Sequence, residues 1–178
     1  PAATSTALAR KLRDEETFRF RMGGEYTPVL SSGPAMKIFG IDPGTHLVGC
    51  GVIDAADRAP RLIKAEILTA SRSHALPDRL AQLRAARRES LREARPGVVV
   101  VGEAVFGRNR ASLIALGEGR GVALLCAAEL HVPIHEYSPA EIKKAVTGTG
   151  GARKEQVASM VRSLLCASID LRADATDA

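Results

Sequence analysis

Two apolar runs in this chain each end in a carboxylate, and this feature constrains the fold most. Residues 37–42 read Lys-Ile-Phe-Gly-Ile-Asp, and residues 98–103 read Val-Val-Val-Val-Gly-Glu. A buried carboxylate is costly unless it meets a cation or hydrogen-bond donors. The second run lacks polar alternation, which is typical of a strand covered on both faces in a parallel pairing. If the two strands are neighbours, Asp42 and Glu103 meet at one sheet edge, where α/β proteins commonly bind ligands. The alternative is that each acid caps a turn.

The segments between these runs predict an α/β domain. Leu47–Asp54 is expected to be a strand, and Arg61–Thr69 alternates apolar and charged residues with the period of a half-exposed strand. Together with the first run they predict an antiparallel meander. Leu76–Ala94 carries leucines on one face, which predicts a helix that leads from the meander to the second apolar run.

The first 35 residues differ from the rest of the chain. They are rich in Ala, Ser, Thr and Arg, lack a clear period, and end in a loop-like Ser-Ser-Gly-Pro stretch. We expect residues 1–35 to be an N-terminal extension, either flexible or derived from expression. Residues 36–178 are expected to form one globular domain, because the 178-residue chain is 46% hydrophobic and 25% charged.

Charge and cysteine content restrict partners and location. The formal net charge of +5 favours a polyanionic partner such as nucleic acid, although a basic surface can also serve solubility. Cys50, Cys126 and Cys166 form no Cys-x-x-Cys motif, so we interpret them as buried thiols of a reducing compartment, the cytoplasm. We expect no membrane span, since no apolar run reaches about 18–20 residues.

Two further acids lie near the C-terminus of the sequence. Asp174 and Asp177 are three residues apart, so on a helix they share one face and can reach the same cations. Hard divalent cations take oxygen ligands, and a pair about 3.5–4 Å apart can stabilise the attacking and leaving oxygens of a phosphodiester. The four acids therefore predict a two-metal nuclease site. The chain ends one residue after Asp177, so we expect these ligands to lie in a terminal turn.

At this point the chain resembles the RuvC-type Holliday-junction resolvases of the RNase H-like nucleases. The resemblance rests on five ordered segments: residues 40–45 (Gly-Ile-Asp-Pro-Gly-Thr), Glu103 to Phe106 with Asn109, the Gly117 to Ala123 run, residues 143–154, and residues 173–178. It implies an RNase H-like fold with a five-stranded mixed sheet flanked by helices. It also implies that Asp42, Glu103, Asp174 and Asp177 are the catalytic metal ligands, with two Mg²⁺ per site and Mn²⁺ as a substitute.

The resemblance also implies DNA contacts. Gly148-Thr149-Gly150-Gly151 joins two amphipathic helices and lacks the ending of a nucleotide-binding loop, so we interpret it as a clamp on the DNA backbone, flanked by Lys143, Lys144, Arg153 and Lys154. Phe106 is expected to stack on an unpaired base at the junction, in a loop that also holds Arg108 and Asn109. The alternative for the basic residues is a solvated surface, and the alternative for Phe106 is packing in the core.

Residues 109–130 have a helical pattern that contains Gly117, Gly119 and Gly121. Because glycine costs about 1 kcal/mol relative to alanine inside a helix, close packing must offset the loss. We expect this helix to meet its copy in a homodimer, which suits two symmetric nicks in a four-way junction; packing against the parent sheet would explain the same glycines. The family further suggests contact with the RuvA–RuvB branch-migration complex.

Three other functions fit parts of the pattern. An RNA-processing nuclease of the YqgF type would share the acidic site, although the Phe106 loop and the basic clamp favour the resolvase. A sugar-kinase or actin-like ATPase also begins with an Asp-x-Gly-Thr turn, but this chain is short for two such domains. A catalytically idle junction-binding module would need the basic surface and not the four acids.

Overall fold

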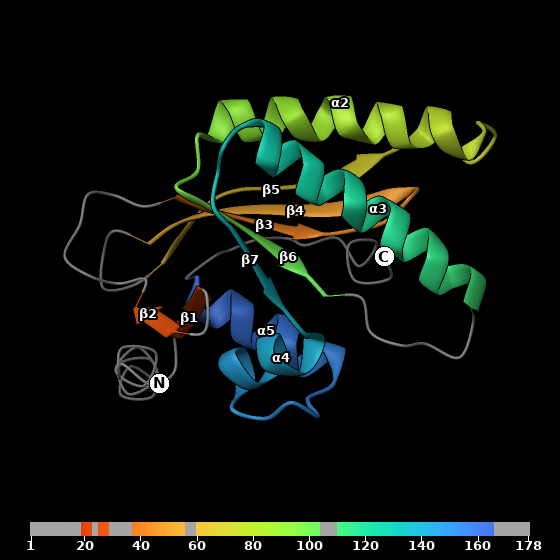
Figure 1. Cartoon of the computed structure of the whole chain (residues 1–178). Coiled ribbons are helices and arrows are strands. Elements are labelled where there is room, and N and C mark those ends of the chain that lie inside the picture. Colours follow the sequence, from red (N-terminus) through yellow and green to blue (C-terminus); the bar gives the residue numbers. More distant parts are fainter. Residues whose placement is uncertain (1–18, 23–24, 29–36, 56–59, 104–109, 166–178) are drawn as a thin grey trace.

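The computed structural model describes residues 19–22, 25–28, 37–55, 60–103 and 110–165. Its main element is a five-stranded sheet with the order β5-β4-β3-β6-β7 (Figure 1). The strands are β3 (Lys37–Asp42), β4 (Leu47–Asp54), β5 (Arg61–Thr69), β6 (Val98–Gly102) and β7 (Ile134–Tyr137). β3, β4 and β5 form the predicted antiparallel meander, while β6 pairs in parallel with both β3 and β7. The predicted five-stranded mixed sheet is confirmed.

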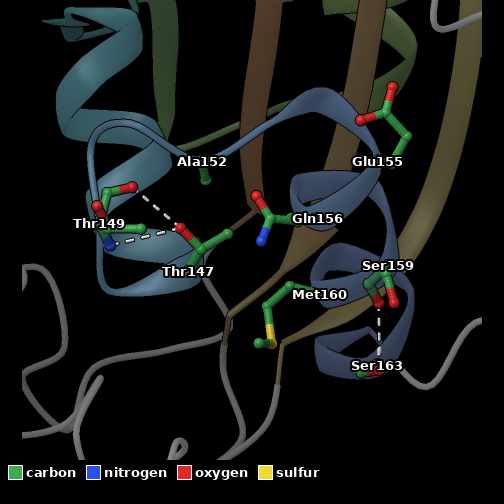
Figure 2. Close-up of a pocket in the computed structure, with 8 residues that line it drawn as sticks. All are labelled: Thr147, Thr149, Ala152, Glu155, Gln156, Ser159, Met160 and Ser163. Atoms are coloured by element: carbon green, nitrogen blue, oxygen red, sulfur yellow. Dashed lines mark hydrogen bonds between the residues drawn. The ribbon is translucent and has the colours of Figure 1, made fainter.

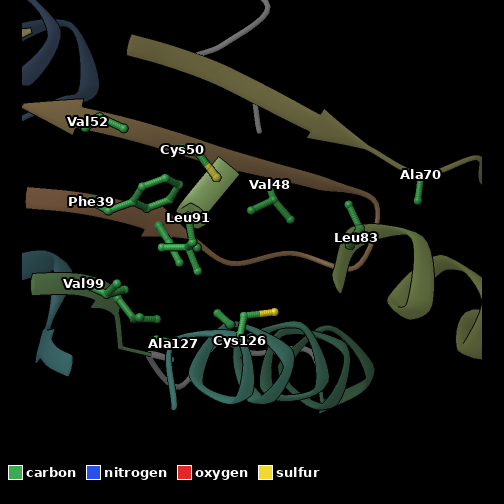
Figure 3. Close-up of a cluster of buried hydrophobic side chains, with 13 residues drawn as sticks. Phe39, Val48, Cys50, Val52, Ala70, Leu83, Leu91, Val99, Cys126 and Ala127 are labelled. Atoms are coloured by element: carbon green, nitrogen blue, oxygen red, sulfur yellow. The ribbon is translucent and has the colours of Figure 1, made fainter. Parts of the chain in front are cut away.

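Four helices accompany the sheet in the described part of the chain: α2 (Leu76–Ala94), α3 (Arg110–Glu129), α4 (Pro139–Thr147) and α5 (Lys154–Leu164). In Figure 1, α2 and α3 lie above the sheet, and α4 and α5 lie below it. The main hydrophobic core lies between the sheet and the α2–α3 layer (Figure 3). Its fully buried members include Phe39, Val48, Leu83, Leu91, Val99, Val101 and Cys126. The two described cysteines, Cys50 and Cys126, are buried free thiols as predicted.

The alternation predicted for β5 is present, but its charged side faces the helices. Glu66 accepts a hydrogen bond from the hydroxyl of Ser90 on α2, and Lys64 forms an ion pair with Glu93 on the same helix. Ile63 and Ile67 remain 46% and 38% exposed. Edge strands often carry charged residues in this way, because charge protects an unpaired edge from association with other chains.

α3 differs from one expectation. By length and composition alone, Ala111–Glu129 could cross a membrane, contrary to the prediction that no segment could. The same test accepts helices that cover the core of a soluble domain, and α3 packs on α2 and contacts β6 and β7. Glu118 and Arg120 lie in its middle, and Arg120 donates to Glu136 of β7. We therefore assign α3 to the layer that covers the sheet.

The N-terminal segment contains a short antiparallel hairpin of β1 (Arg19–Met22) and β2 (Glu25–Pro28), which is a separate two-stranded sheet. The sequence pattern did not predict these strands. The division of the chain into an extension of residues 1–35 and a domain of residues 36–178 stays a prediction.

Candidate active site

Asp42 is the last residue of β3, and a glycine lies beside it on the neighbouring strand. It pairs with Gly49 on β4, and a Cβ added to Gly49 would lie 3.4 Å from the Asp42 Cβ. That distance is at the short end of an ordinary van der Waals contact, so glycine at this position leaves room for the acid beside β4. The Asp42 side chain is exposed at the end of the strand.

The turn after Asp42 is fixed by two further close approaches. A Cβ on Gly44 would lie 2.1 Å from the Leu47 carbonyl oxygen, so the turn can close only with glycine there. A Cβ on Gly119 of α3 would lie 2.5 Å from the Gly44 carbonyl oxygen, so helix and turn pack backbone against backbone. Packing inside the chain therefore explains Gly119, whereas Gly117 and Gly121 have no atom within 4 Å of an added Cβ.

Glu103 lies directly after β6, the strand next to β3. The register places Ile41 opposite Val101, so the chain reaches Asp42 and Glu103 at the same end of two adjacent parallel strands. The Glu103 backbone N–H donates to the Tyr137 carbonyl at 2.8 Å, which extends the pairing with β7 to the acid itself. The predicted convergence of the two strand ends is thus present in the structure.

The electrostatics of Asp42 reflect two opposing effects. Atoms that displace water around the carboxyl raise its pKa above the ordinary value, while the positive charge of Lys154 on α5 acts to lower it. A carboxylate that has lost part of its hydration gains more from a nearby cation than one in bulk water. Asp42 is therefore suited to a positively charged partner.

The described residues contain no group of three or more His, Cys, Asp or Glu side chains that could hold a metal ion. Asp174 and Asp177, which are needed to complete the predicted set of four acids, lie outside the described residues, as do Phe106, Arg108 and Asn109. The metal-ligand and base-stacking assignments of these residues stay predictions.

The predicted clamp is a helical hairpin. α4 begins at a capping box, in which Ser138 and Glu141 exchange hydrogen bonds, and ends at Gly148 with φ of 82°. The Thr147 hydroxyl donates to the carbonyls of Lys143 and Thr149 and holds the turn that leads to α5. The basic residues flank the turn in the sequence, with Lys143 and Lys144 in the second half of α4 and Arg153 and Lys154 at the start of α5.

Beside this turn is an open cavity of about 470 Å³ between the two helices (Figure 2). Polar residues such as Thr149, Gln156 and Ser159 line it together with Ala152 and Met160. It does not contain Asp42 or Glu103, so we do not assign it to the active site.

Comparison with known proteins gives a consistent result. Residues 38–178 match the family model described as crossover junction endodeoxyribonuclease RuvC. Proteins of that name from Chloroflexus aurantiacus and Dehalococcoides mccartyi are 41% and 44% identical over 144 residues, 80% of this chain and 88% and 87% of theirs.

Solved structures show the same relationship. The structure of T. thermophilus RuvC in complex with a Holliday junction substrate has a TM-score of 0.72 and 34% identity, over 79% of this chain and 88% of that chain. The yeast mitochondrial Holliday junction resolvase Ydc2, at 12% identity, covers 76% of this chain and 67% of its own with a TM-score of 0.53, and shows a shared fold.

Proposed function

Because the chain belongs to the RuvC family of crossover junction endodeoxyribonucleases, we propose that it resolves four-way DNA junctions by paired symmetric nicks. The observation that carries this proposal is the parallel pairing of β3 with β6, which brings the ends of the strands that carry Asp42 and Glu103 together. The family match also runs to residue 178 and so includes Asp174 and Asp177.

The four acids Asp42, Glu103, Asp174 and Asp177 would hold two divalent cations. Asp42 fits this role because it is exposed beside a glycine, is partly desolvated, and offers only oxygen donors. Oxygen ligands favour Mg²⁺, with Mn²⁺ as the substitute. Bound cations would lower the pKa of the attacking water and stabilise charge at the cleaved phosphodiester. The acids would position the cations at the cleaved bond. The products would carry a 5′-phosphate and a 3′-hydroxyl.

Phosphate contacts would come from the α4–α5 hairpin. The second half of α4 carries Lys143 and Lys144, and the start of α5 carries Arg153 and Lys154. Lys154 is close enough to Asp42 to influence its pKa. Such contacts supply affinity without reading sequence. In the loop after Glu103, Phe106 would stack on an unpaired base, with Arg108 and Asn109 as further polar contacts.

The exposed face of α3 supports a homodimer. Ile114 and Leu125 are 64% and 49% exposed, and Gly117 and Gly121 lie between them at helical spacing with open space around an added Cβ. Apolar and small residues on one stripe let two helices approach closely. Two copies would carry the two active sites that symmetric nicking needs. We place the protein in the cytoplasm, with the branch-migration complex as a further partner.

The direct test uses a synthetic immobile four-way junction and a matched linear duplex, each with and without Mg²⁺ or Mn²⁺. We expect paired nicks in the junction alone, dependent on metal and abolished by Asp42→Asn, while junction binding persists. Retained cleavage by Asp42→Asn would contradict the site. Metal-dependent cleavage of RNA with no preference for the junction would favour an RNA-processing nuclease of the YqgF type.

A further inference from the structure

One row of residues crosses the sheet at the level of Asp42. Asp42 pairs with Gly49 on β4, and Gly49 in turn pairs with Ile67 on β5. On the other side, the Ile41–Val101 pair puts Gly102 beside Asp42, and Gly102 pairs with Tyr137 of β7. Paired residues of neighbouring strands share a face, so Asp42, Gly102 and Tyr137 lie on the same face of the sheet.

This face is the one turned away from α2 and α3. Ile41 and Val101, one position earlier, are buried in the core below those helices. Glu136, one position before Tyr137, accepts a hydrogen bond from Arg120 of α3. Since side chains alternate along a strand, Asp42 and Tyr137 stand on the opposite face.

Only Gly102 lies between Asp42 and Tyr137 in this row. Two strand spacings separate their Cα atoms, or roughly 10 Å, and Gly102 adds no side chain between them. The buried Pro43 lies next to Gly102, because a Cβ added to this glycine would be 3.7 Å from the Pro43 Cδ. Lys154 acts on Asp42 from α5, so positive charge lies near the same end of the strands.

Tyr137 offers a hydrogen-bond donor at this place. The residue is half-buried, and a tyrosine phenol keeps its proton at neutral pH and can donate a hydrogen bond. Its backbone is also fixed to the site, because its carbonyl accepts from Glu103 N–H at 2.8 Å.

We infer that the Tyr137 hydroxyl donates a hydrogen bond to a phosphate oxygen of the DNA strand that is cut, and so holds this strand across Gly102, next to Asp42. The inference rests on the proposed function and adds a specific substrate contact to the same site. Core packing would need the Tyr137 ring but not its hydroxyl.

The test compares Tyr137→Phe with the unchanged full chain in junction cleavage. The substitution keeps the ring and removes the donor. A hydrogen bond to a charged group is worth about one factor of ten or more, so we expect kcat/KM to fall about tenfold or more with an unchanged Tm. An unchanged kcat/KM would overturn the inference.

A second measurement identifies the contact as a phosphate. Single methylphosphonates, which lack the phosphate charge, are placed along the cut strand near the nick. For the unchanged protein, one position should lose about tenfold in cleavage, and Tyr137→Phe should show no further loss at that position. If the two losses multiply at every position, the hydroxyl acts through the fold and the inference is wrong.

The position of the strand over Gly102 can be tested separately. In Gly102→Ala, the new Cβ lies 3.7 Å from Pro43, an ordinary contact, so the fold should persist while the added methyl group stands between Asp42 and Tyr137 and slows cleavage several-fold. Gly51→Ala is the matched control, because Gly51 lies on the same face, two residues along β4 from Gly49, with no atom within 4 Å of an added Cβ. Equal cleavage by both variants would contradict a DNA strand that crosses Gly102. Failure of the proposed function would instead be seen as cleavage by Asp42→Asn, whatever Tyr137→Phe does.

Discussion

Arg87 brings a guanidinium into the core between α2, α3 and the sheet. It is fully buried, and its three nitrogens have no hydrogen-bond partner among the residues the structure describes. Burial lowers its pKa, and the titratable groups beside it are the thiols of Cys126 and Cys50, which are weak acceptors. A charge buried with so little compensation destabilises the folded state.

The first prediction concerns this arginine. Arg87→Met keeps much of the side-chain length and removes the charge, so we expect the free energy of unfolding to rise by about 1–4 kcal/mol, as when buried ionic groups are replaced by apolar ones. Arg87→Ala is the control, because it removes the charge but leaves a cavity. Urea denaturation of both variants gives the comparison, and a less stable Arg87→Met would mean that the guanidinium has strong acceptors in the folded protein.

Local sequence pattern predicted the elements better than the contacts between them. The predicted bounds of β3, β4, β5 and α2 agree with the structure, because their periods and breakers are local signals. The side of β5 that faces α2 was not predicted, because the contacts of Lys64 with Glu93 and of Glu66 with Ser90 join segments far apart in the sequence. The position that we propose for Tyr137 likewise depends on distant segments. Its place beside Gly102 comes from the parallel pairing of β6 with β7, two segments joined by the whole of α3.

At the start of α4, Ser138 and Glu141 form a capping box. The Ser138 hydroxyl accepts from Glu141 N–H at 3.3 Å and donates to the Glu141 carboxylate at 2.7 Å. We expect Ser138→Ala to lower the free energy of unfolding by about 0.5–2 kcal/mol. Hydrogen bonds from Ser138 lower the pKa of Glu141 in the folded state, so the contribution of its charge is present above its unfolded pKa. It is lost as the pH falls through the lowered folded value. Denaturation at pH 7 and near pH 3 should therefore give a smaller effect of Ser138→Ala at the lower pH.

A second prediction at this scale concerns the contact between α3 and the turn after Asp42. In Gly119→Ala, the methyl group meets the Gly44 carbonyl at 2.5 Å, so helix and turn must separate. Overpacking of this kind costs about 1–3 kcal/mol, which exceeds the roughly 1 kcal/mol that alanine adds to a helix. We expect lower stability and slower junction cleavage, because the turn holds Asp42. Gly117→Ala is the matched control for stability, because there is open space at the added Cβ. Gly117 lies on the proposed dimer stripe, so the two variants are compared in stability and not in cleavage. Equal effects on stability would contradict the contact.

At the scale of the whole molecule, the sheet separates the hydrophobic core from the face that carries Asp42 and Tyr137. α2 and α3 cover the core on one side, and α4 and α5 lie on the other side of the sheet (Figure 1). Asp42 and Tyr137 belong to this second face by strand register, and Lys154 of α5 acts on Asp42. Only the outer stripe of α3 connects the packed side to a second copy in our proposal. Dimerisation and chemistry are therefore placed on separate surfaces, so one can be changed without the other.

This separation gives the last prediction. Leu125 is 49% exposed on α3, and Leu125→Glu would place a charge on each side of the dimer contact. Two buried like charges are strongly unfavourable, so we expect a monomer in sedimentation experiments at concentrations where the unchanged protein is a dimer. The monomer should keep its Tm, because Leu125 contributes little to the core, but it should lose the coordination of the two nicks and make single nicks in a four-way junction. Ile63→Glu is the control, since Ile63 has similar exposure on β5 and lies away from α3. A dimeric Leu125→Glu variant with paired nicks would show that the copies meet through another surface.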